Sequence, residues 1–364
     1  SKLTGAGAFL LSTGTLTLNG AFGAAGGFSQ TGGVLAGTHT LDTGVTWTAG
    51  TWSSSGATTL AAGRTLSISG TAAHDFNLRQ VVVNGTVNWS QGQLRSGSGA
   101  TFTVASGAVF NDTTAVSTSI NNDLGGAGGS TFNNSGIFNK IGATTTTIDQ
   151  VFNQTGTVNV SNGTLRLIGG GTSSGGYSTA AGATVNFANN YALIDGLALL
   201  GAGAYAITAG TLTATGTINV SNLTLSGGTL AGTHTLNGGL TWNGGNANAA
   251  GTTTIPSGST LVIAPNTSGN PFDHDFNSHH FVNQGTVEWQ AGSGRLRSGN
   301  AGTFSNSGVF NDAASSAFNN DLGGVAIAFH NSSGGTYNKT AVGTTTFDAA
   351  FNNAGTVNVN AGTL

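Results

Sequence analysis

A long internal repeat constrains the fold of this chain more than any other feature of its sequence. Short runs of residues return in the same order about 195–200 positions later. The clearest matches are LAGTHTL at residues 35–41 and 230–236, HDFN at 74–77 and 274–277, and GTVNV at 156–160 and 355–359. An ordered series at a nearly constant offset indicates a tandem duplication. We therefore predict two repeats, residues 1–199 and 200–364, the second incomplete, in a chain cut from a longer array.

A finer rhythm inside each repeat predicts short β-strands. A glycine and a small residue precede alternating apolar and polar positions in runs such as GTLTL, GTVNW, GATFTV and GTVNV. Alternation with a period of two places one set of side chains on the inner face of a strand. Such strands fit either a β-sandwich or the stacked coils of a β-solenoid.

Three observations favour the solenoid. Most turns are clusters of Ser, Gly and Ala, whereas hairpins favour two-residue Asn-Gly or Asp-Gly loops. The strands follow at irregular spacings, as expected for coils of two or three strands joined by variable corners. Phe-Asn pairs such as Phe110-Asn111 and Phe310-Asn311 recur in both repeats, which predicts an inward ring followed by an outward or corner Asn whose amide ladders with the next coil. The predicted fold is an all-β parallel β-helix, or β-solenoid, with coils of about 20 residues.

The composition removes several classes of protein. Only 6% of the residues are charged, and polar positions are filled by Thr, Ser, Asn and Gly, which disfavours helices. The chain has no Cys, which excludes disulfides and thiolate metal sites. Nine Lys and Arg residues and a pI near 6.1 supply no basic footprint for nucleic acid. A membrane-spanning helix needs about 18 consecutive apolar residues, and the sequence predicts none.

The densest group of titratable residues lies at 272–280, with the sequence FDHDFNSHH. On a strand, Asp273 and Asp275 would share one face and His274 would lie on the other, so the three would not converge. The first repeat keeps only the His-Asp pair of this group, at 74–75. We therefore favour a structural corner over a metal or catalytic site, and we predict no catalytic, cofactor-binding or metal-binding residues.

Histidine and tryptophan positions also repeat. His39 and His234 occur in identical THTL segments, and we favour an outward strand position over a pH-sensitive or ligand-binding role. The repeated tryptophans are Trp47, Trp89, Trp242 and Trp289. Each lies on a strand in which apolar and polar residues alternate, and burial there is favoured over an exposed ring that stacks on sugars.

Six charged positions recur between the repeats. They are Asp75/Asp275, Arg95/Arg297, Asp112/Asp312, Asp123/Asp321, Lys140/Lys339 and Asp149/Asp348. Their repetition suggests fixed ion pairs or contacts with a neighbouring molecule. Because exposed pairs contribute little stability, a solvated surface is the favoured interpretation.

Runs such as FNNAGTVNVNAGTL, FNQTGTVNVSNGTLRL and GTLTATGTINVSNLTLSGGTL resemble the repeats of very large bacterial surface proteins. These are filamentous-haemagglutinin-like exoproteins and the passenger domains of autotransporter adhesins. The resemblance covers most of the chain and rests on composition and short repeat units. It implies a right-handed parallel β-helix, export across the outer membrane, and a structural or adhesive role at the cell surface.

The leading functional hypothesis is a non-enzymatic, extracellular structural or adhesive β-solenoid at the bacterial cell surface. It would belong to a longer protein that self-associates into a fibre or surface layer and contacts cell-surface glycans. A polysaccharide-binding or polysaccharide-cleaving β-helix is an alternative, for which cleavage needs clustered acids. Ice binding is a second alternative, which needs Thr-x-Thr units aligned between coils, and these units recur irregularly.

Overall fold

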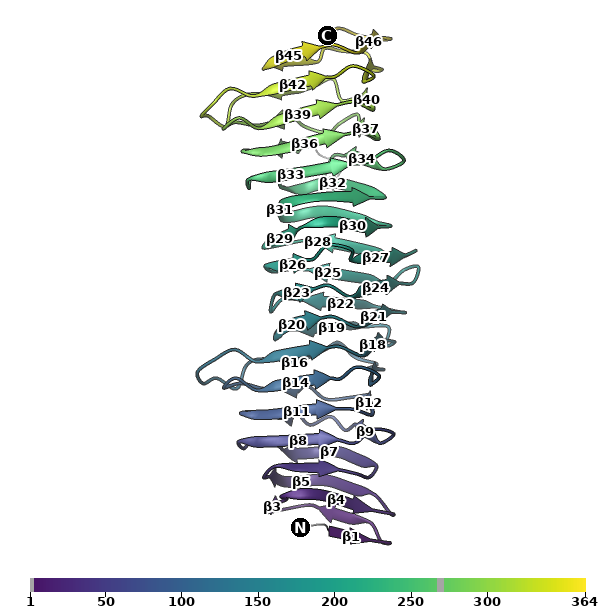
Figure 1. Ribbon diagram of the computed structural model, residues 1–364, viewed down its shortest axis with the longest axis vertical. Helices are drawn as coiled ribbons and strands as arrows, with labels where there is room; N and C mark the ends of the chain where they lie inside the picture. Colours follow the sequence, from purple (N-terminus) through teal and green to yellow (C-terminus); the bar gives the residue numbers. More distant parts are fainter. Residues whose placement is uncertain (1–2, 267–271) are drawn as a thin grey trace. The chain divides into compact units, whose positions relative to one another are not determined.

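The computed structural model describes residues 3–266 and 272–364, and every regular element in these residues is a β-strand. Strands pair in parallel with strands about 21 residues away and build a β-solenoid of about 16 turns (Figure 1). The predicted all-β parallel β-solenoid is confirmed, and its handedness stays a prediction. Contacts within the chain define two compact units, Ser1–Val185 (unit 1) and Asn186–Leu364 (unit 2). The boundary predicted at 199/200 belongs to the sequence repeat and stays a prediction.

The strands of unit 1 form three rows, in which neighbouring strands are hydrogen-bonded one turn apart. Row 1 holds β1 (Leu3–Gly5), β4 (Gly20–Ala24), β6 (His39–Leu41), β8 (Gly56–Leu60), β11 (Arg79–Val83), β14 (Thr101–Val104), β17 (Thr131–Asn134), β20 (Val151–Gln154) and β23 (Gly171–Ser173). Row 2 holds β2 (Phe9–Leu11), β5 (Phe28–Ala36), β7 (Val45–Thr51), β9 (Thr65–Ile68), β12 (Thr86–Trp89), β15 (Val109–Asp112), β18 (Ile137–Lys140), β21 (Thr157–Val160) and β24 (Gly176–Thr179). Row 3 holds β3 (Thr15–Thr17), the ends of β5 and β7, β10 (His74–Asp75), β13 (Leu94–Arg95), β16 (Thr118–Asn121), β19 (Thr145–Ile148) and β22 (Thr164–Leu167). The boundary between the units falls within β25 (Thr184–Phe187).

Unit 2 has three rows as well, numbered here by the sequence features that they share with unit 1. Row 1 holds β27 (Ala198–Gly201), β30 (Gly216–Val220), the end of β31 (Leu223–Asn237), β33 (Gly251–Ile255), β36 (His279–Asn283), β39 (Thr303–Asn306), β42 (Ala328–Asn331) and β45 (Ala350–Asn353). Row 2 holds β28 (Ala204–Ile207), the start of β31, β32 (Gly239–Asn246), β34 (Thr260–Ile263), β37 (Thr286–Trp289), β40 (Val309–Asp312), β43 (Thr336–Lys339) and β46 (Thr356–Val359). Row 3 holds β26 (Tyr191–Leu193), β29 (Thr211–Ala214), the middle of β31, β35 (His274–Asp275), β38 (Leu296–Arg297), β41 (Ala317–Asn319) and β44 (Thr346–Asp348).

Alternation along each strand sorts side chains between the interior and the surface. In β15, Phe110 is fully buried and the next residue, Asn111, faces outward. Inward rings stack from one turn to the next: the centroids of Phe110 and Phe138 lie 5.1 Å apart at an interplanar angle of 5°. In unit 2, Phe304 and Phe329 stack at 5.6 Å and 13°. The predicted pattern of inward ring and outward Asn is therefore confirmed.

Corners between the rows bring the backbones of successive turns into close contact. At Gly142, a Cβ atom would lie 2.0 Å from the carbonyl oxygen of Thr114. At Gly156, it would lie 2.1 Å from the carbonyl oxygen of Gly136. No side chain fits at such a distance, so stacking itself selects glycine at these corners.

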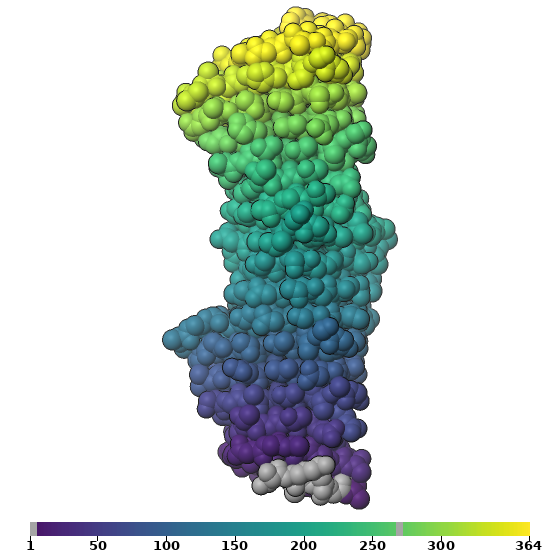
Figure 2. Space-filling model, in the orientation of Figure 1, coloured from purple at the N-terminus to yellow at the C-terminus, as the bar shows by residue number. Residues whose placement is uncertain are grey.

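Each unit carries a long loop that contains the sequence NDLGG, at residues 122–126 and 320–324. Residues 122–130 connect β16 to β17 in unit 1, and residues 320–327 connect β41 to β42 in unit 2. In Figure 1 and Figure 2, each loop projects from the strands of its own unit. The loop in unit 1 lengthens its turn: Asn111 and its register partner Asn139 are 28 residues apart, whereas Asn139 and its partner Asn159 are 20 residues apart.

Candidate functional site

A column of asparagines runs along the outer face of row 2 in unit 1. Asn88, Asn111, Asn139 and Asn159 are register partners in successive parallel strands. From Asn111 onward, each side-chain amide donates a hydrogen bond of 2.9 Å to the side-chain oxygen of the preceding rung. This column confirms the amide ladder predicted from the sequence.

Unit 2 presents the same arrangement on its row 2. Asn311 donates to Glu288 at 2.8 Å, Asn338 donates to Asn311 at 2.9 Å, and Asn358 donates to Asn338 at 2.9 Å. We call these two columns the outer ladders. Because an amide has two N–H groups and two lone pairs, the ladder contacts leave a donor and an acceptor on each amide. The rungs repeat at the strand spacing of about 4.8 Å.

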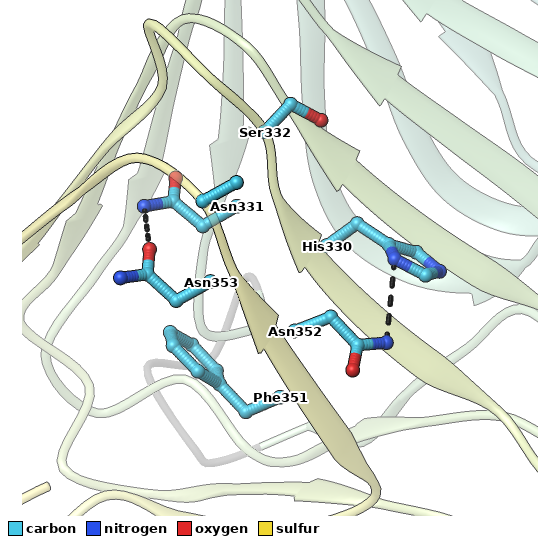
Figure 3. A pocket seen from close by; sticks show the side chains of 7 residues that line it. His330, Asn331, Ser332, Phe351, Asn352 and Asn353 are labelled. Atoms are coloured by element: carbon cyan, nitrogen blue, oxygen red, sulfur yellow. Dashed lines mark hydrogen bonds between the residues drawn. The ribbon is translucent and has the colours of Figure 1, made fainter.

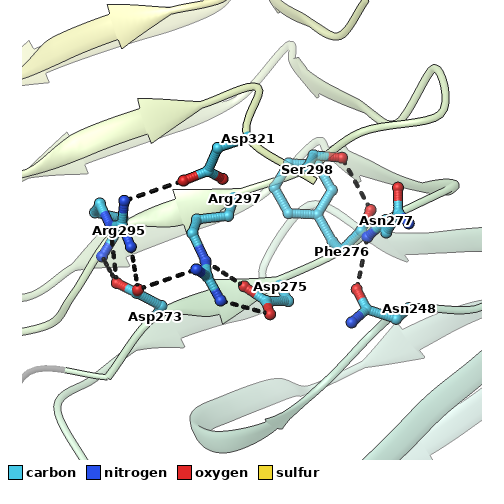
Figure 4. A network of polar contacts seen from close by, with 9 residues as sticks. All are labelled: Asn248, Asp273, Asp275, Phe276, Asn277, Arg295, Arg297, Ser298 and Asp321. Atoms are coloured by element: carbon cyan, nitrogen blue, oxygen red, sulfur yellow. Dashed lines mark hydrogen bonds and ion pairs between the residues drawn. The ribbon is translucent and has the colours of Figure 1, made fainter. Parts of the chain in front are cut away.

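Figure 4 shows a network of charged side chains on the outer face of row 3 in unit 2. Arg295 contacts Asp273 at 2.6 Å and Asp321 at 3.0 Å. Arg297 binds both carboxylate oxygens of Asp275, at 2.7 and 2.8 Å, and lies 3.5 Å from Asp273. Burial alone would raise the pKa of Asp273, but the hydrogen bonds and charge of Arg295 outweigh it and lower that pKa. Each of these carboxylates is thus held by a guanidinium.

The matching position in unit 1 holds a simpler pair. Arg95 binds Asp75 through both carboxylate oxygens, at 2.8 and 2.9 Å. The side-chain hydrogen bond to Asp75 raises the pKa of Arg95. At these repeated charges the structure has fixed ion pairs, and the interpretation that favoured a solvated surface is wrong.

The titratable groups at 272–280 are separated, as predicted. His274 is fully buried, and its Nε2 lies 3.1 Å from the carbonyl oxygens of Trp242 and Ala264. Burial lowers the pKa of His274 to about 4. Asp273 and Asp275 lie on the opposite, outer face with their arginine partners. Within residues 3–266 and 272–364, no three His, Cys, Asp or Glu side chains form a group that could hold a metal ion.

The outward position expected for His39 and His234 is wrong. Both side chains face inward and are 3% exposed. Nε2 of His39 lies 3.1 Å from the Thr58 hydroxyl, and Nε2 of His234 lies 3.0 Å from the Thr253 hydroxyl. Burial lowers the pKa of each histidine to about 4. The Thr253 hydroxyl also lies 2.9 Å from Nε2 of His279, so one hydroxyl bridges two buried imidazoles.

The solvated surface expected for the repeated charges is also wrong at Asp112, Asp312, Lys140 and Lys339. All four residues are fully buried in row 2. Lys140 Nζ lies 3.8 Å from Asp112 Oδ2. In unit 2, the Tyr337 hydroxyl donates to Asp312 at 2.8 Å. Burial lowers the pKa of Lys140 and raises the pKa of Tyr337. The solvated surface is confirmed at Asp123 and Asp348, which are exposed, whereas Asp321 is exposed but forms an ion pair with Arg295.

A signal for these inward polar residues was present in the sequence. His39 precedes Leu41 by two positions on β6, and both are buried. Asp112 follows Phe110 by two positions on β15, and both are buried. Polarity favoured the surface, whereas a period of two placed each polar residue on the same side as its apolar neighbour. Strand geometry decides the outcome because the interior supplies hydrogen-bond partners.

The burial predicted for the repeated tryptophans is confirmed. Trp47, Trp89, Trp242 and Trp289 are at most 1% exposed. Trp47 stacks on Trp52 with ring centroids 4.1 Å apart. These rings fill the interior and present no face to a sugar.

A hollow of about 400 Å³ lies on row 1 of unit 2, beside β42 and β45. Its lining consists of His330, Asn331, Ser332, Phe351, Asn352, Asn353 and Ala354. Figure 3 shows Asn352 directed toward His330, at 3.4 Å, and Asn331 directed toward Asn353, at 2.8 Å. Such amide and imidazole groups suit hydrogen bonding to a neutral polar molecule.

Comparisons with protein-family models, with curated proteins and with solved structures find no match to this chain. The fold assignment therefore rests on the strand pairing itself. The specific resemblance to filamentous-haemagglutinin-like exoproteins and autotransporter passengers stays a prediction. The described residues include no helix that is long and apolar enough to cross a membrane.

Proposed function

We propose that this chain is a non-enzymatic structural or adhesive segment of an extracellular bacterial surface protein that self-associates. The observation that carries the proposal is the pair of outer ladders. Each unit presents on row 2 a column of amides whose spacing is fixed by the backbone ladder beneath it. A surface of this kind is regular and repeated, and among the rungs named above only Glu288 carries a charge.

Regularity lowers the free-energy cost of association. Each rung amide is already held by its neighbours, so a partner that docks on the ladder immobilises few additional rotamers. Asparagine ladders in paired β-sheets form dry, closely packed interfaces with identical ladders. Soluble β-proteins use charged side chains to prevent such contacts, and only 6% of the residues in this chain are charged. A second copy of the chain is therefore a suitable partner for the outer face.

Repetition supports an adhesive role in the same way. Two equivalent surfaces on one chain bind a multivalent target with an effective concentration set by their linkage, and avidity exceeds the affinity of either surface alone. A cell-surface glycan, with hydroxyl groups at regular intervals, could pair with the donors and acceptors left on the ladder amides.

One observation bears on the ice-binding alternative. The outward column that runs through Ser29 and Thr46 continues as Ser67, Asn88 and Asn111 in successive turns. Threonine is therefore not repeated along this column, whereas a flat array of identical hydroxyls requires it.

Self-association can be tested with charge placed on the outer ladders. The double variant Asn111→Asp/Asn338→Asp puts a carboxylate in the middle of each ladder, where like charges would face each other between copies. The control Asn162→Asp/Asn360→Asp adds the same charge at exposed positions outside the ladders. Sedimentation velocity across a concentration series, with electron microscopy of the same samples, measures the association.

The wild-type chain and the control are expected to form larger species or filaments as concentration rises, and the ladder variant is expected to remain smaller. Filaments should show the strand spacing of about 4.8 Å along their axis in diffraction. A wild-type chain that stays monomeric at every concentration would contradict self-association. Equal association of the ladder variant and the control would show that the ladders are not the interface.

A further inference from the structure

Two Lys–Asp pairs are buried inside the rows and take no part in the outer surface. Asp112 and Lys140 are register partners in β15 and β18, and Asp312 and Lys339 are register partners in β40 and β43. All four residues are fully buried. Removal of an ion pair from water costs several kcal/mol for each ion. A chain that uses so little charge nevertheless keeps this pair at the same register in both units.

The groups around the unit 1 pair hold its carboxyl group in a fixed orientation. Asp112 Oδ1 accepts hydrogen bonds from the backbone N–H of Thr114 at 3.1 Å and from its hydroxyl at 2.7 Å. Asp112 Oδ2 accepts a hydrogen bond from the Thr146 hydroxyl. Lys140 Nζ lies 3.8 Å from the same Oδ2 and donates to the carbonyl oxygen of Gly142. The amine is therefore next to a carboxyl group whose two oxygens carry different donors.

The stack closes this site on both sides along the row. Trp89 is the register partner of Asp112 in the preceding turn, and Val160 is the partner of Lys140 in the following turn. Both are at most 1% exposed. The pair therefore lies in surroundings that exclude water.

We propose that Lys140 and Asp112 condense into an intramolecular isopeptide bond that joins two successive turns of unit 1. A proton passes from the ammonium to the carboxylate, which gives a neutral amine and a neutral carboxylic acid. The Nζ lone pair then forms a bond to Cγ of Asp112. The bond from Cγ to one carboxyl oxygen breaks, and that oxygen leaves as water with the acid proton and one proton from Nζ. The products are one secondary amide and one water molecule, and no oxidant or other reactant is needed.

The surroundings favour each part of this reaction. Burial lowers the pKa of Lys140, which favours the neutral, nucleophilic form of its amine. The N–H and hydroxyl of Thr114 point at Oδ1 and can stabilise negative charge that develops there as the amine adds. Groups held in a reactive arrangement behave as if present at about 10⁵–10⁸ M. A neutral amide also removes the buried charges, and its formation releases water from a closed interior.

The matching pair in unit 2 differs in the donors to its carboxyl group and in the partners of its lysine amine. Position 314 is Ala, so the hydroxyl donor that Thr114 supplies in unit 1 is replaced by a methyl group. Lys339 Nζ donates to the Ser315 hydroxyl at 3.1 Å and to the carbonyl oxygen of Ala341 at 2.7 Å. We expect Lys339 to keep its free amine, which makes it a reference lysine within the same chain.

Mass spectrometry of the purified wild-type chain tests the proposal directly. A closed bond lowers the intact mass by one water, about 18 Da, relative to the sequence. After denaturation, trypsin should fail to cleave at Lys140, so that residues 96–166 appear as one peptide lighter by about 18 Da. An amine-specific label applied to the denatured chain should react with Lys339 and not with Lys140.

Two variants separate this bond from other causes of the same mass loss. Lys140→Met should restore the full mass, and Lys339→Met, the matched control, should keep the deficit. A deficit in which trypsin still cleaves at Lys140 would indicate an aspartyl succinimide and would overturn the proposal. Full mass in the wild-type chain, with Lys140 cleaved and labelled, would overturn it as well. The decision rests on Lys140 alone and does not depend on folding of either variant.

Discussion

A buried ladder of asparagines in unit 2 allows a quantitative test of how the solenoid is stabilised. On row 1, Asn283 donates to Asn306 at 2.7 Å, Asn306 donates to Asn331 at 2.8 Å, and Asn331 donates to Asn353 at 2.8 Å. The first three residues are at most 1% exposed. We call this column the inner ladder, and Asn306→Ala is the perturbation that interrupts it.

The expected loss follows from the bonds that Asn306 makes. The substitution removes the acceptor of the bond from Asn283, the donor of the bond to Asn331, and a 3.2 Å bond to the carbonyl oxygen of Thr336. A buried polar group left without a partner costs about 1–3 kcal/mol. Because two neighbouring side chains each lose a partner, the variant should lose roughly 2–6 kcal/mol of stability. The cavity left by the missing amide adds to this loss.

The outer ladder of the same unit supplies a matched control five positions along the chain. Asn311 also donates one bond along its ladder, to Glu288 at 2.8 Å, and accepts one from Asn338 at 2.9 Å. Its face is turned to solvent, so water can replace the lost bonds. Asn311→Ala, which is the same chemical change, should cost less than about 1 kcal/mol.

Hydrogen exchange measured by mass spectrometry suits a stacked fold, which opens locally and need not unfold in one step. Amides of β39 and β42 should exchange faster in Asn306→Ala by a factor equivalent to the predicted loss, at about 1.4 kcal/mol for each tenfold change. Peptides of unit 1 serve as the internal reference. If Asn306→Ala and Asn311→Ala accelerate exchange equally, burial does not determine how much a ladder hydrogen bond contributes to stability, and the reasoning fails.

Three further predictions test the interior. Three buried histidines have pKa values lowered from 6.5 to about 4, namely His39, His234 and His274. Between pH 4 and pH 6.5 the unfolded chain binds more protons than the folded chain. The free energy of unfolding should therefore be highest above about pH 6.5 and fall toward pH 4, by roughly 3 kcal/mol for each histidine. A denaturant midpoint that stays constant from pH 7.5 to 4.5 would contradict this prediction. Gly142→Ala should be strongly destabilising because its Cβ would meet the carbonyl oxygen of Thr114, whereas Gly44→Ala, with nothing within 4 Å, should be nearly neutral in thermal unfolding. Arg79 is fully buried and donates hydrogen bonds to three carbonyl and two hydroxyl oxygens. Arg79→Met should therefore lower the free energy of unfolding by at least about 3 kcal/mol in chemical denaturation. A smaller loss would show that water replaces those bonds.

Period-two alternation made the strands, the buried tryptophans and the Phe-Asn pattern predictable. It is a local property, fixed by the pleat of each strand. The number of rows was not predictable, because a corner is defined by which turns stack on it. Gly142 has room only for hydrogen because Thr114 lies one turn below it, and nothing next to Gly142 in the sequence identifies that neighbour. Partners of the inner ladder are likewise separated by more than 20 residues.

The inward positions of Asp112 and Lys140 were missed because their benefit exists only in the stacked state. Each residue alone prefers water, and each becomes stable inside when the next turn supplies its partner. The same residues pin the register of the stack.

The row 2 column that contains them runs through Ile68, Trp89, Asp112, Lys140 and Val160. Apolar rungs of this column would tolerate a slip by one turn, because one apolar residue replaces another. A slip would place Lys140 against an apolar rung and leave two buried charges unpaired, at a cost of several kcal/mol. A few polar residues inside a repetitive stack therefore distinguish the native register from its neighbours, which identical apolar rungs cannot do.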